Sequence, residues 1–274
     1  MNNAQLAYLA LDVARQAAAL VRERRAAGVS VAATKSSDVD IVTEADRASE
    51  ALIRSLLTAA RPDDSILGEE EDDRIGTSGV RWIVDPIDGT VNFLYGLPQY
   101  SVSIAAERDG EVVAGIVINV ASEVEYVGHL ADAAPDGVSP AVATRNGEPI
   151  AVRTPGPLSQ RLLVTGFNYD AGLRELQGAA LARLIGQVRD VRRLGSCALD
   201  LCHVAEGAVD GFFEEGVNLW DYAAGGLIAR VAGARFDMIR GIGGTGLVVC
   251  APDHGFEELL SAVRNAGFSP ETGE

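Results

Sequence analysis

The sequence contains little cysteine and histidine, with three of each among 274 residues. The cysteines have no Cys-x-x-Cys spacing, and no pair of histidines has the spacing of a zinc site. An odd cysteine count without paired spacing argues against a disulfide framework and against structural zinc. We therefore expect reduced cysteines, as in a cytoplasmic protein.

Long apolar runs are also missing. Charged residues interrupt every apolar stretch well before the roughly 20 residues that cross a bilayer. The first residues, Met-Asn-Asn-Ala-Gln, lack the basic flank and apolar core of a secretory signal. We expect neither a signal peptide nor a transmembrane helix, and no membrane partner.

Positive charge is scarce: 23 Lys and Arg residues face 39 Asp and Glu residues, which gives a formal net charge of −16. Such a chain repels the phosphate backbone of nucleic acids, so we expect no direct nucleic-acid partner. The same charge repels a phosphorylated metabolite unless cations reverse the local sign. A phosphate substrate would therefore require a bound metal.

Acidic residues, in contrast, occur at the ends of predicted strands and helices. Residues 82–90 read Trp-Ile-Val-Asp-Pro-Ile-Asp-Gly-Thr, an apolar run that predicts a buried strand ending in Asp85 and Asp88. Glu69 and Asp221 occur in two further acidic motifs, Gly-Glu-Glu-Glu and Trp-Asp. Carboxylate oxygens gathered from separate element ends suit a small divalent cation. The pattern predicts metal-dependent phosphate chemistry.

Hydrophobic periodicity divides the chain into two halves. The first predicts two helices, over 4–26 and from a Thr43 cap to about 62, followed by short strands and an antiparallel meander. We read 131–140 as a loop and Asn146-Gly147 as a tight hairpin turn. The predicted strands are 65–68, 81–84, 101–106, 112–120 and 124–129.

After residue 150 strands and helices alternate, which predicts an α/β half after an α+β half. The predicted strands are 162–165, 191–194, 209–213 and 247–250, and the predicted helices are 173–185, 196–206, 219–231 and 256–266. We therefore expect a first domain over 1–150 with Glu69, Asp85 and Asp88, and a second over 151–274 with Glu214 and Asp221.

The motifs Gly68-Glu69-Glu70, Asp85-Pro86-Ile87-Asp88-Gly89-Thr90 and Trp220-Asp221-Tyr222-Ala223-Ala224-Gly225 together resemble the inositol monophosphatase family. This is a lithium-sensitive, magnesium-dependent phosphatase superfamily that includes fructose bisphosphatases, and the chain looks most similar to bacterial inositol-1-monophosphatases. The resemblance implies a layered α-β-α-β-α sandwich, a homodimer and inhibition by lithium.

The resemblance also implies two or three Mg²⁺ ions per site. Asp85 would bridge two of them. Glu69 and the carbonyl of Ile87 would complete the first site, and Asp88 and Asp221 the second. A third ion would bind through Glu69 and water.

Catalytic roles follow from the same resemblance. Glu69 and Thr90 would orient and deprotonate the attacking water, and Asp46 would hold Thr90. Lys35 would lie near the metal-bound waters.

The substrate-binding set implied by the resemblance includes backbone amides and side chains. The amides of Gly89 and Thr90 would hold phosphate oxygens, Glu214 would bind a substrate hydroxyl, and Cys197 would lie beside the sugar ring. Asp88 and Asp221 complete this set. We expect the choice between substrates to depend on the region of Asn168, Cys197, Glu214 and Asn218.

Several of these residues have simpler readings. An isolated Asp-Pro-x-Asp-Gly is a common solvated turn, and a carboxylate site can bind Ca²⁺ for stability. Lys35 can be a surface lysine, Cys197 can be simple packing, and Glu70 is read as a surface charge. The segment 241–246 contains Gly-x-Gly-x-x-Gly, but a strand rather than a helix follows it, so we read it as a loop.

The predicted reaction is hydrolysis of a small polyol phosphomonoester, foremost myo-inositol 1-phosphate, by direct attack of a metal-activated water. Fructose-1,6-bisphosphatase, histidinol-phosphatase and nucleotide 3′-phosphatase activities remain alternatives because the metal motifs are shared. A non-catalytic interaction role in transcription or ribosome assembly is a further alternative.

Overall fold

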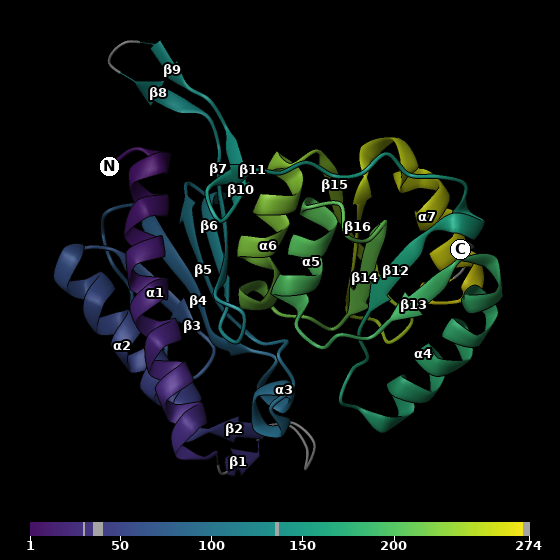
Figure 1. Ribbon diagram of the computed structural model, residues 1–274, viewed down its shortest axis with the longest axis horizontal. Coiled ribbons are helices and arrows are strands. Elements are labelled where there is room, and N and C mark those ends of the chain that lie inside the picture. The colour runs from purple at the N-terminus through teal and green to yellow at the C-terminus, as the bar shows by residue number, and fades with distance from the viewer. Residues whose placement is uncertain (30, 35–40, 135–136, 271–274) are drawn as a thin grey trace.

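The chain folds into five layers in the order helices, sheet, helices, sheet, helices (Figure 1). The structure is a computed structural model that describes residues 1–29, 31–34, 41–134 and 137–270. Helices α1 (Asn3–Ala27) and α2 (Glu44–Ala60) cover the outer face of the first sheet. Helices α4 (Ala171–Leu184) and α7 (Asp253–Ala266) cover the outer face of the second. The predicted sandwich is thus confirmed.

The first sheet has seven strands in the order β11-β10-β7-β6-β5-β4-β3. All neighbouring pairs are antiparallel except β3 and β4, which are parallel. The expected meander is therefore present. Its strands are β3 (Ser65–Gly68), β4 (Val80–Asp88), β5 (Ser101–Arg108), β6 (Glu111–Asn119), β7 (Val124–His129), β10 (Val142–Arg145) and β11 (Glu148–Pro149).

The second sheet has five strands in the order β13-β12-β14-β16-β15. Its strands are β12 (Leu162–Thr165), β13 (Asp190–Arg192), β14 (Gly211–Glu215), β15 (Ala234–Arg240) and β16 (Gly246–Pro252). Helices α5 (Cys197–Ala205) and α6 (Leu219–Val231) lie between the two sheets (Figure 1). The division at residue 150 stays a prediction, because this middle layer packs against both sheets.

Strand periodicity explains the packing. In β4, Trp82 and Val84 pack against α1 and α2, while Ile83 between them packs into the middle layer. In β14, Phe212 faces the middle layer and Phe213 faces α4 and α7. Alternate side chains of a strand point to opposite faces, so both faces of each sheet are buried.

The structure contains several strands and one helix that the sequence reading did not predict. The stretch 131–140, expected to be a loop, contains the antiparallel strands β8 (Asp132–Ala134) and β9 (Gly137–Ser139). Short alternation in Ala-Asp-Ala-Ala does not distinguish such a hairpin from a loop. The sequence reading also lacked strands β1 (Val31–Thr34) and β2 (Ile41–Thr43), strand β15 and helix α3 (Thr90–Tyr95). No helix in the described part of the chain is long and apolar enough to cross a bilayer.

Candidate active site

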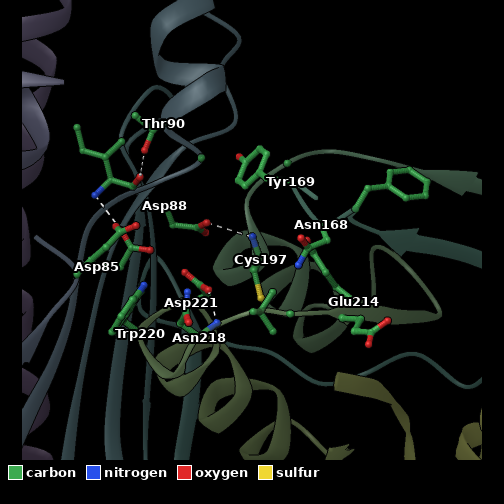
Figure 2. Close-up of a pocket in the computed structure, with 18 of the residues that line it drawn as sticks. Asp85, Asp88, Thr90, Asn168, Tyr169, Cys197, Glu214, Asn218, Trp220 and Asp221 are labelled. Carbon is green, nitrogen blue, oxygen red and sulfur yellow. Dashed lines mark hydrogen bonds between the residues drawn. The ribbon is translucent and has the colours of Figure 1, made fainter. Parts of the chain in front are cut away.

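A cavity of about 370 Å³ collects the predicted site residues from both halves of the chain (Figure 2). This volume is at the lower end of the ~300–1,000 Å³ that small-molecule sites occupy, which suits a small metabolite. The predicted residues that line it are Glu69, Asp85, Ile87, Asp88, Gly89, Thr90, Asn168, Cys197, Glu214, Asn218 and Asp221. Lys35 lies outside the described residues.

The end of β4 supplies the first two carboxylates. Register with β5 shifts between Asp85 and Asp88, where Pro86 has no N–H to donate. The Asp85 carboxylate accepts a hydrogen bond from the Ile87 amide at 3.0 Å. The irregular end of β4 therefore brings both acidic side chains to the cavity, and both line it.

Thr90 begins α3 and is held through its hydroxyl. Its Oγ1 lies 3.1 Å from Asp46 Oδ1 and 3.0 Å from the Ile87 carbonyl oxygen. Asp46 itself is fully buried and does not line the cavity. Its other oxygen accepts a hydrogen bond from the Thr43 amide at 2.8 Å, which completes a capping box with the predicted Thr43 cap. Asp46 thus contacts the site through Thr90.

Gly89 turns the chain between the acidic strand end and α3. Its φ of +95° is in the left-handed region, where a side chain is strained. A Cβ atom there would also lie 2.9 Å from the Gln99 carbonyl oxygen and 3.0 Å from that of Gly195. Glycine is required at this position on both counts.

Asp88 faces the start of α5. It accepts hydrogen bonds from the Ser196 hydroxyl at 2.5 Å, the Ala198 amide at 2.8 Å and the Cys197 amide at 3.2 Å. Burial disfavours the charged carboxylate and raises the pKa of Asp88 to about 6, although these hydrogen bonds oppose the shift.

Asp221 enters the cavity from the first turn of α6. Its carboxylate accepts a hydrogen bond from the amide of Asn218, the residue that caps this helix, at 2.5 Å. Burial, with repulsion from Asp88 and Glu69, raises the pKa of Asp221 well above its usual value. The mutual influence of these three acids reflects their convergence on one cavity.

The cavity is strongly acidic. Its lining includes six carboxylates and, in the described part of the chain, Arg193 as its single basic side chain. The carboxylates are Glu69, Asp85, Asp88, Glu214, Glu215 and Asp221. Glu214 is largely surrounded by protein, and this burial raises its pKa to about 7 even though Arg193 lowers it. Such a surface repels a phosphate group until its charge is neutralised.

Burial also disfavours the charged forms of two α5 side chains, Cys197 in the cavity lining and Asp200 behind it. Burial raises the pKa of the Cys197 thiol well above its usual value, so this cysteine is no nucleophile near neutral pH. Asp200 on α5 is fully buried, and neither of its carboxylate oxygens has a hydrogen-bond partner in the part of the chain described. Burial, then repulsion from Glu214, raises the pKa of Asp200 well above the usual range.

The donor set fits a hard divalent cation in its chemistry, since carboxylate and carbonyl oxygens are the ligands Mg²⁺ prefers. Within the described residues, however, no three acidic, histidine or cysteine side chains converge closely enough to hold an ion as they stand. Asp88 is turned toward α5 and Asp221 toward its own cap. A cation that binds here would share the oxygens of these carboxylates with the amide and hydroxyl donors, or replace those donors.

Sequence reasoning missed three features of the site. Arg193, Asp200 and Trp220 were given no individual role, yet Arg193 and Trp220 line the cavity. The indole Nε1–H of Trp220 is buried without a partner among the described residues. An isolated arginine belongs to no recognisable motif. Arg193 follows β13 and Glu214 lies on β14, so the sheet order β13-β12-β14 brings the two side chains near each other.

Comparison with known proteins agrees with this geometry. The sequence model of the inositol monophosphatase family matches residues 2–267. Inositol-1-monophosphatase SuhB of Mycobacterium tuberculosis is 44% identical over 97% of this chain and 96% of its own length. The protein named Nus factor SuhB of Pasteurella multocida is 37% identical over 82% of both chains.

A crystal structure of the suhB protein of Bartonella henselae superposes with a TM-score of 0.84 at 30% identity, covering 95% of this chain and 98% of that one. The five-layered fold is therefore shared along almost the whole chain. Together with the match of the family model, these relatives show that the chain belongs to the inositol monophosphatase family and is a phosphatase that hydrolyses phosphoric monoesters.

Proposed function

We propose that the protein hydrolyses the phosphomonoester of a small polyol, with myo-inositol 1-phosphate as the preferred substrate, in a Mg²⁺-dependent reaction. The observation that carries this proposal is the gathering of six carboxylates around a cavity of about 370 Å³. An acidic cavity of this kind needs cations before it can accept a phosphate. The name inositol-1-monophosphatase of the Mycobacterium tuberculosis relative supports the choice of ester.

Glu69, Asp85, Asp88, Asp221 and the Ile87 carbonyl would hold two or three Mg²⁺ ions. Bound Mg²⁺ would neutralise these groups, polarise the phosphate and lower the pKa of water. The remaining steps use residues of the chain itself.

Thr90 and Glu69 would orient the attacking water and accept its proton. The hydrogen bond between Thr90 and the buried Asp46 supports this role, because it fixes the hydroxyl at the edge of the cavity. The amides of Gly89 and Thr90 at the start of α3 would bind phosphate oxygens. The neutral Cys197 thiol argues against a covalent cysteine intermediate.

Substrate choice would depend on the opposite wall, which includes Asn168, Cys197, Glu214 and Asn218. Glu214 can accept or donate a hydrogen bond to a polyol hydroxyl, because its pKa of about 7 permits both forms near neutral pH. Arg193 lies in the same cavity and partly balances the charge of Glu214.

The test is phosphate release from myo-inositol 1-phosphate, fructose 1,6-bisphosphate, histidinol phosphate and a nucleoside 3′-phosphate, with and without Mg²⁺ and Li⁺. We expect the highest kcat/KM for the inositol ester, dependence on Mg²⁺ and inhibition by Li⁺. A much higher kcat/KM for another ester would contradict the proposed substrate.

A role as a Nus factor is a second candidate, favoured by the name of the Pasteurella multocida relative. The net charge of −16 argues against direct RNA contact and leaves a basic protein partner possible. Asp88→Asn separates the two roles: we expect phosphatase activity to fall by orders of magnitude, whereas assembly with a protein partner would persist.

A further inference from the structure

One face of α2 contacts two of the chain segments that bring carboxylates to the cavity, the end of β4 and the segment after β3. Asp46 meets Thr90 Oγ1 at 3.1 Å, and the buried Ser49 donates to the Pro86 carbonyl oxygen at 3.2 Å. Residues three and four apart share a helix face, so Glu50, the next along this face, is directed at the same side of the sheet. Its contacts are with the segment that carries Glu69.

Glu50 is fully buried and binds the backbone just after Glu69. One of its carboxylate oxygens accepts the Glu70 amide at 2.7 Å, and the other accepts the Glu71 amide at 3.1 Å. A buried carboxylate is costly unless it is hydrogen-bonded and paired. Glu50 meets both conditions, because Arg54 Nε also donates to it at 2.7 Å.

Arg54 holds the same segment from its carbonyl side. Its guanidinium donates to the Glu71 carbonyl oxygen at 2.9 Å, and its Nε lies 3.7 Å from the Glu71 carboxylate. Amides bound by Glu50 and a carbonyl bound by Arg54 fix both the position and the direction of the chain at residues 70–71. Glu69 is the residue immediately before this fixed stretch.

Gly68, on the other side of Glu69, shows how closely the pair approaches. A Cβ atom at Gly68 would lie 2.1 Å from Glu50 Oε1 and 2.7 Å from an Arg54 guanidinium nitrogen. The absence of a side chain therefore lets the carboxylate and guanidinium pack against the backbone. Glu69 is thus bracketed on both sides by contacts with one ion pair.

A purely structural role would not require a charged pair at this position. Glu50 is fully buried, and burying a carboxylate costs free energy that its ion pair with Arg54 only partly offsets. An apolar side chain could fill the same space without that desolvation cost. What an apolar side chain lacks is the ability to orient two backbone amides.

We propose that Glu50 and Arg54 are positioning residues that fix the backbone on both sides of Glu69, so that its carboxylate faces the cavity before a cation binds. The inference rests on the proposed Mg²⁺-dependent function. Groups that hold a metal ligand in place typically change metal affinity by ~10–100-fold when removed. Loss of the pair should therefore weaken Mg²⁺ binding more than it slows turnover at saturating Mg²⁺.

The test compares the full-length wild type with Glu50→Gln and with Arg61→Gln as matched control. Arg61, just after the same helix, forms an ion pair with the buried Asp64 rather than with Glu50. Three quantities are measured: hydrogen exchange of the backbone amides of residues 68–72, Mg²⁺ binding by calorimetry without substrate, and the Mg²⁺ concentration that gives half-maximal phosphate release.

For Glu50→Gln we expect faster exchange over residues 68–72, at least roughly tenfold weaker Mg²⁺ binding, and kcat at saturating Mg²⁺ within about threefold of the wild type. Arg61→Gln should leave the Mg²⁺ requirement unchanged. Equal Mg²⁺ affinity in the two variants would overturn the proposal, as would unchanged exchange over residues 68–72.

Arg54→Gln replaces Glu50→Gln if the latter does not fold, with the same expected direction in all three measurements. If the wild type releases no phosphate from any ester, the proposed function fails, while exchange and calorimetry still decide the role of the pair.

Discussion

At the residue scale, the side chains of the site are held in place by hydrogen bonds to one another and to neighbouring backbone groups. Asp46, Thr90 and the Ile87 carbonyl form one continuous set of hydrogen bonds, and Asp88 is held by the first turn of α5. Each contact restricts a group that the proposed reaction needs in one orientation. The effects of single substitutions should therefore appear in turnover before they appear in folding.

Replacement of Thr90 tests this directly. Thr90→Ala removes the hydroxyl that lies 3.1 Å from Asp46, and we expect kcat to fall by roughly 10²–10⁴-fold because a group that positions or transfers a proton is lost. Thr90→Ser keeps the hydroxyl and should retain most of the activity. Steady-state phosphate release measures both. Equal activity in the alanine and serine variants would contradict the role of the hydroxyl.

Glu214 gives a prediction about stability and pH in the metal-free protein. Its pKa is raised from 4.5 to about 7 in the folded chain, so the folded state holds a proton that the unfolded state releases. The stabilising contribution is complete below pH 4.5 and is lost as the pH rises through about 7. Asp88, with its pKa raised to about 6, acts in the same direction.

Glu214→Gln should therefore flatten the fall in the free energy of unfolding between pH 5 and pH 8. Urea unfolding in the presence of a chelator measures it at each pH. An unchanged slope in the variant would show that Glu214 does not hold its proton in the folded chain.

At the element scale, the turn between β4 and α3 determines how the acidic strand end meets the phosphate site. Gly89 takes a φ of +95° and packs against the carbonyl oxygens of Gln99 and Gly195. The turn has no room for a side chain, and its geometry decides where Thr90 and the first amides of α3 point.

Gly89→Ala should lower the free energy of unfolding by about 1–3 kcal/mol and reduce phosphate release, since both strain and close contact oppose the Cβ atom. Gly79→Ala is the matched control, because Gly79 has a φ of +81° but no atom within 4 Å of a Cβ placed there. It should cost less stability and leave activity unchanged. Chemical denaturation and phosphate release measure the two effects.

Elements with strong local signals could be predicted from the sequence. The Thr43 cap with Asp46, the strand over 124–129 and the helix over 219–231 lie where the pattern placed them. Helix α3, with six residues, is too short for a period of 3.6 to show. Strand β15 begins Ala-Arg-Phe-Asp-Met, in which apolar and charged residues alternate as in a half-buried strand. This signal was therefore present in the sequence, and the sequence reading overlooked it.

The contacts between elements could not be predicted. The acidic motifs with Asp85, Asp88, Glu69 and Asp221 were visible in the sequence, and their individual roles were inferred from resemblance to a known family. The structure brings all four to one cavity. The Glu50–Arg54 pair has no such motif. Its contact with residues 70 and 71 depends on how α2 packs on the first sheet, which local periodicity does not encode.

At the scale of the whole molecule, one buried middle layer joins the two sheets. Ile83 and Val117 of the first sheet pack with Phe212 and Val248 of the second, around α5 and α6. Carboxylates that are more than a hundred residues apart are thereby held by a common core. Because the interior of that core is close-packed, it fixes the place of the cavity between them.

The charge of the whole molecule makes a cation necessary for the proposed reaction. A net charge of −16 and six carboxylates around the cavity oppose the entry of any phosphate ester. Bound Mg²⁺ would offset most of the local negative charge while leaving the rest of the surface acidic.

The central claim is most directly tested by kcat/KM for myo-inositol 1-phosphate after exhaustive chelation and again after Mg²⁺ is restored. We predict that chelation removes phosphate release almost completely and that added Mg²⁺ recovers it. Undiminished hydrolysis in the chelated protein would contradict the account.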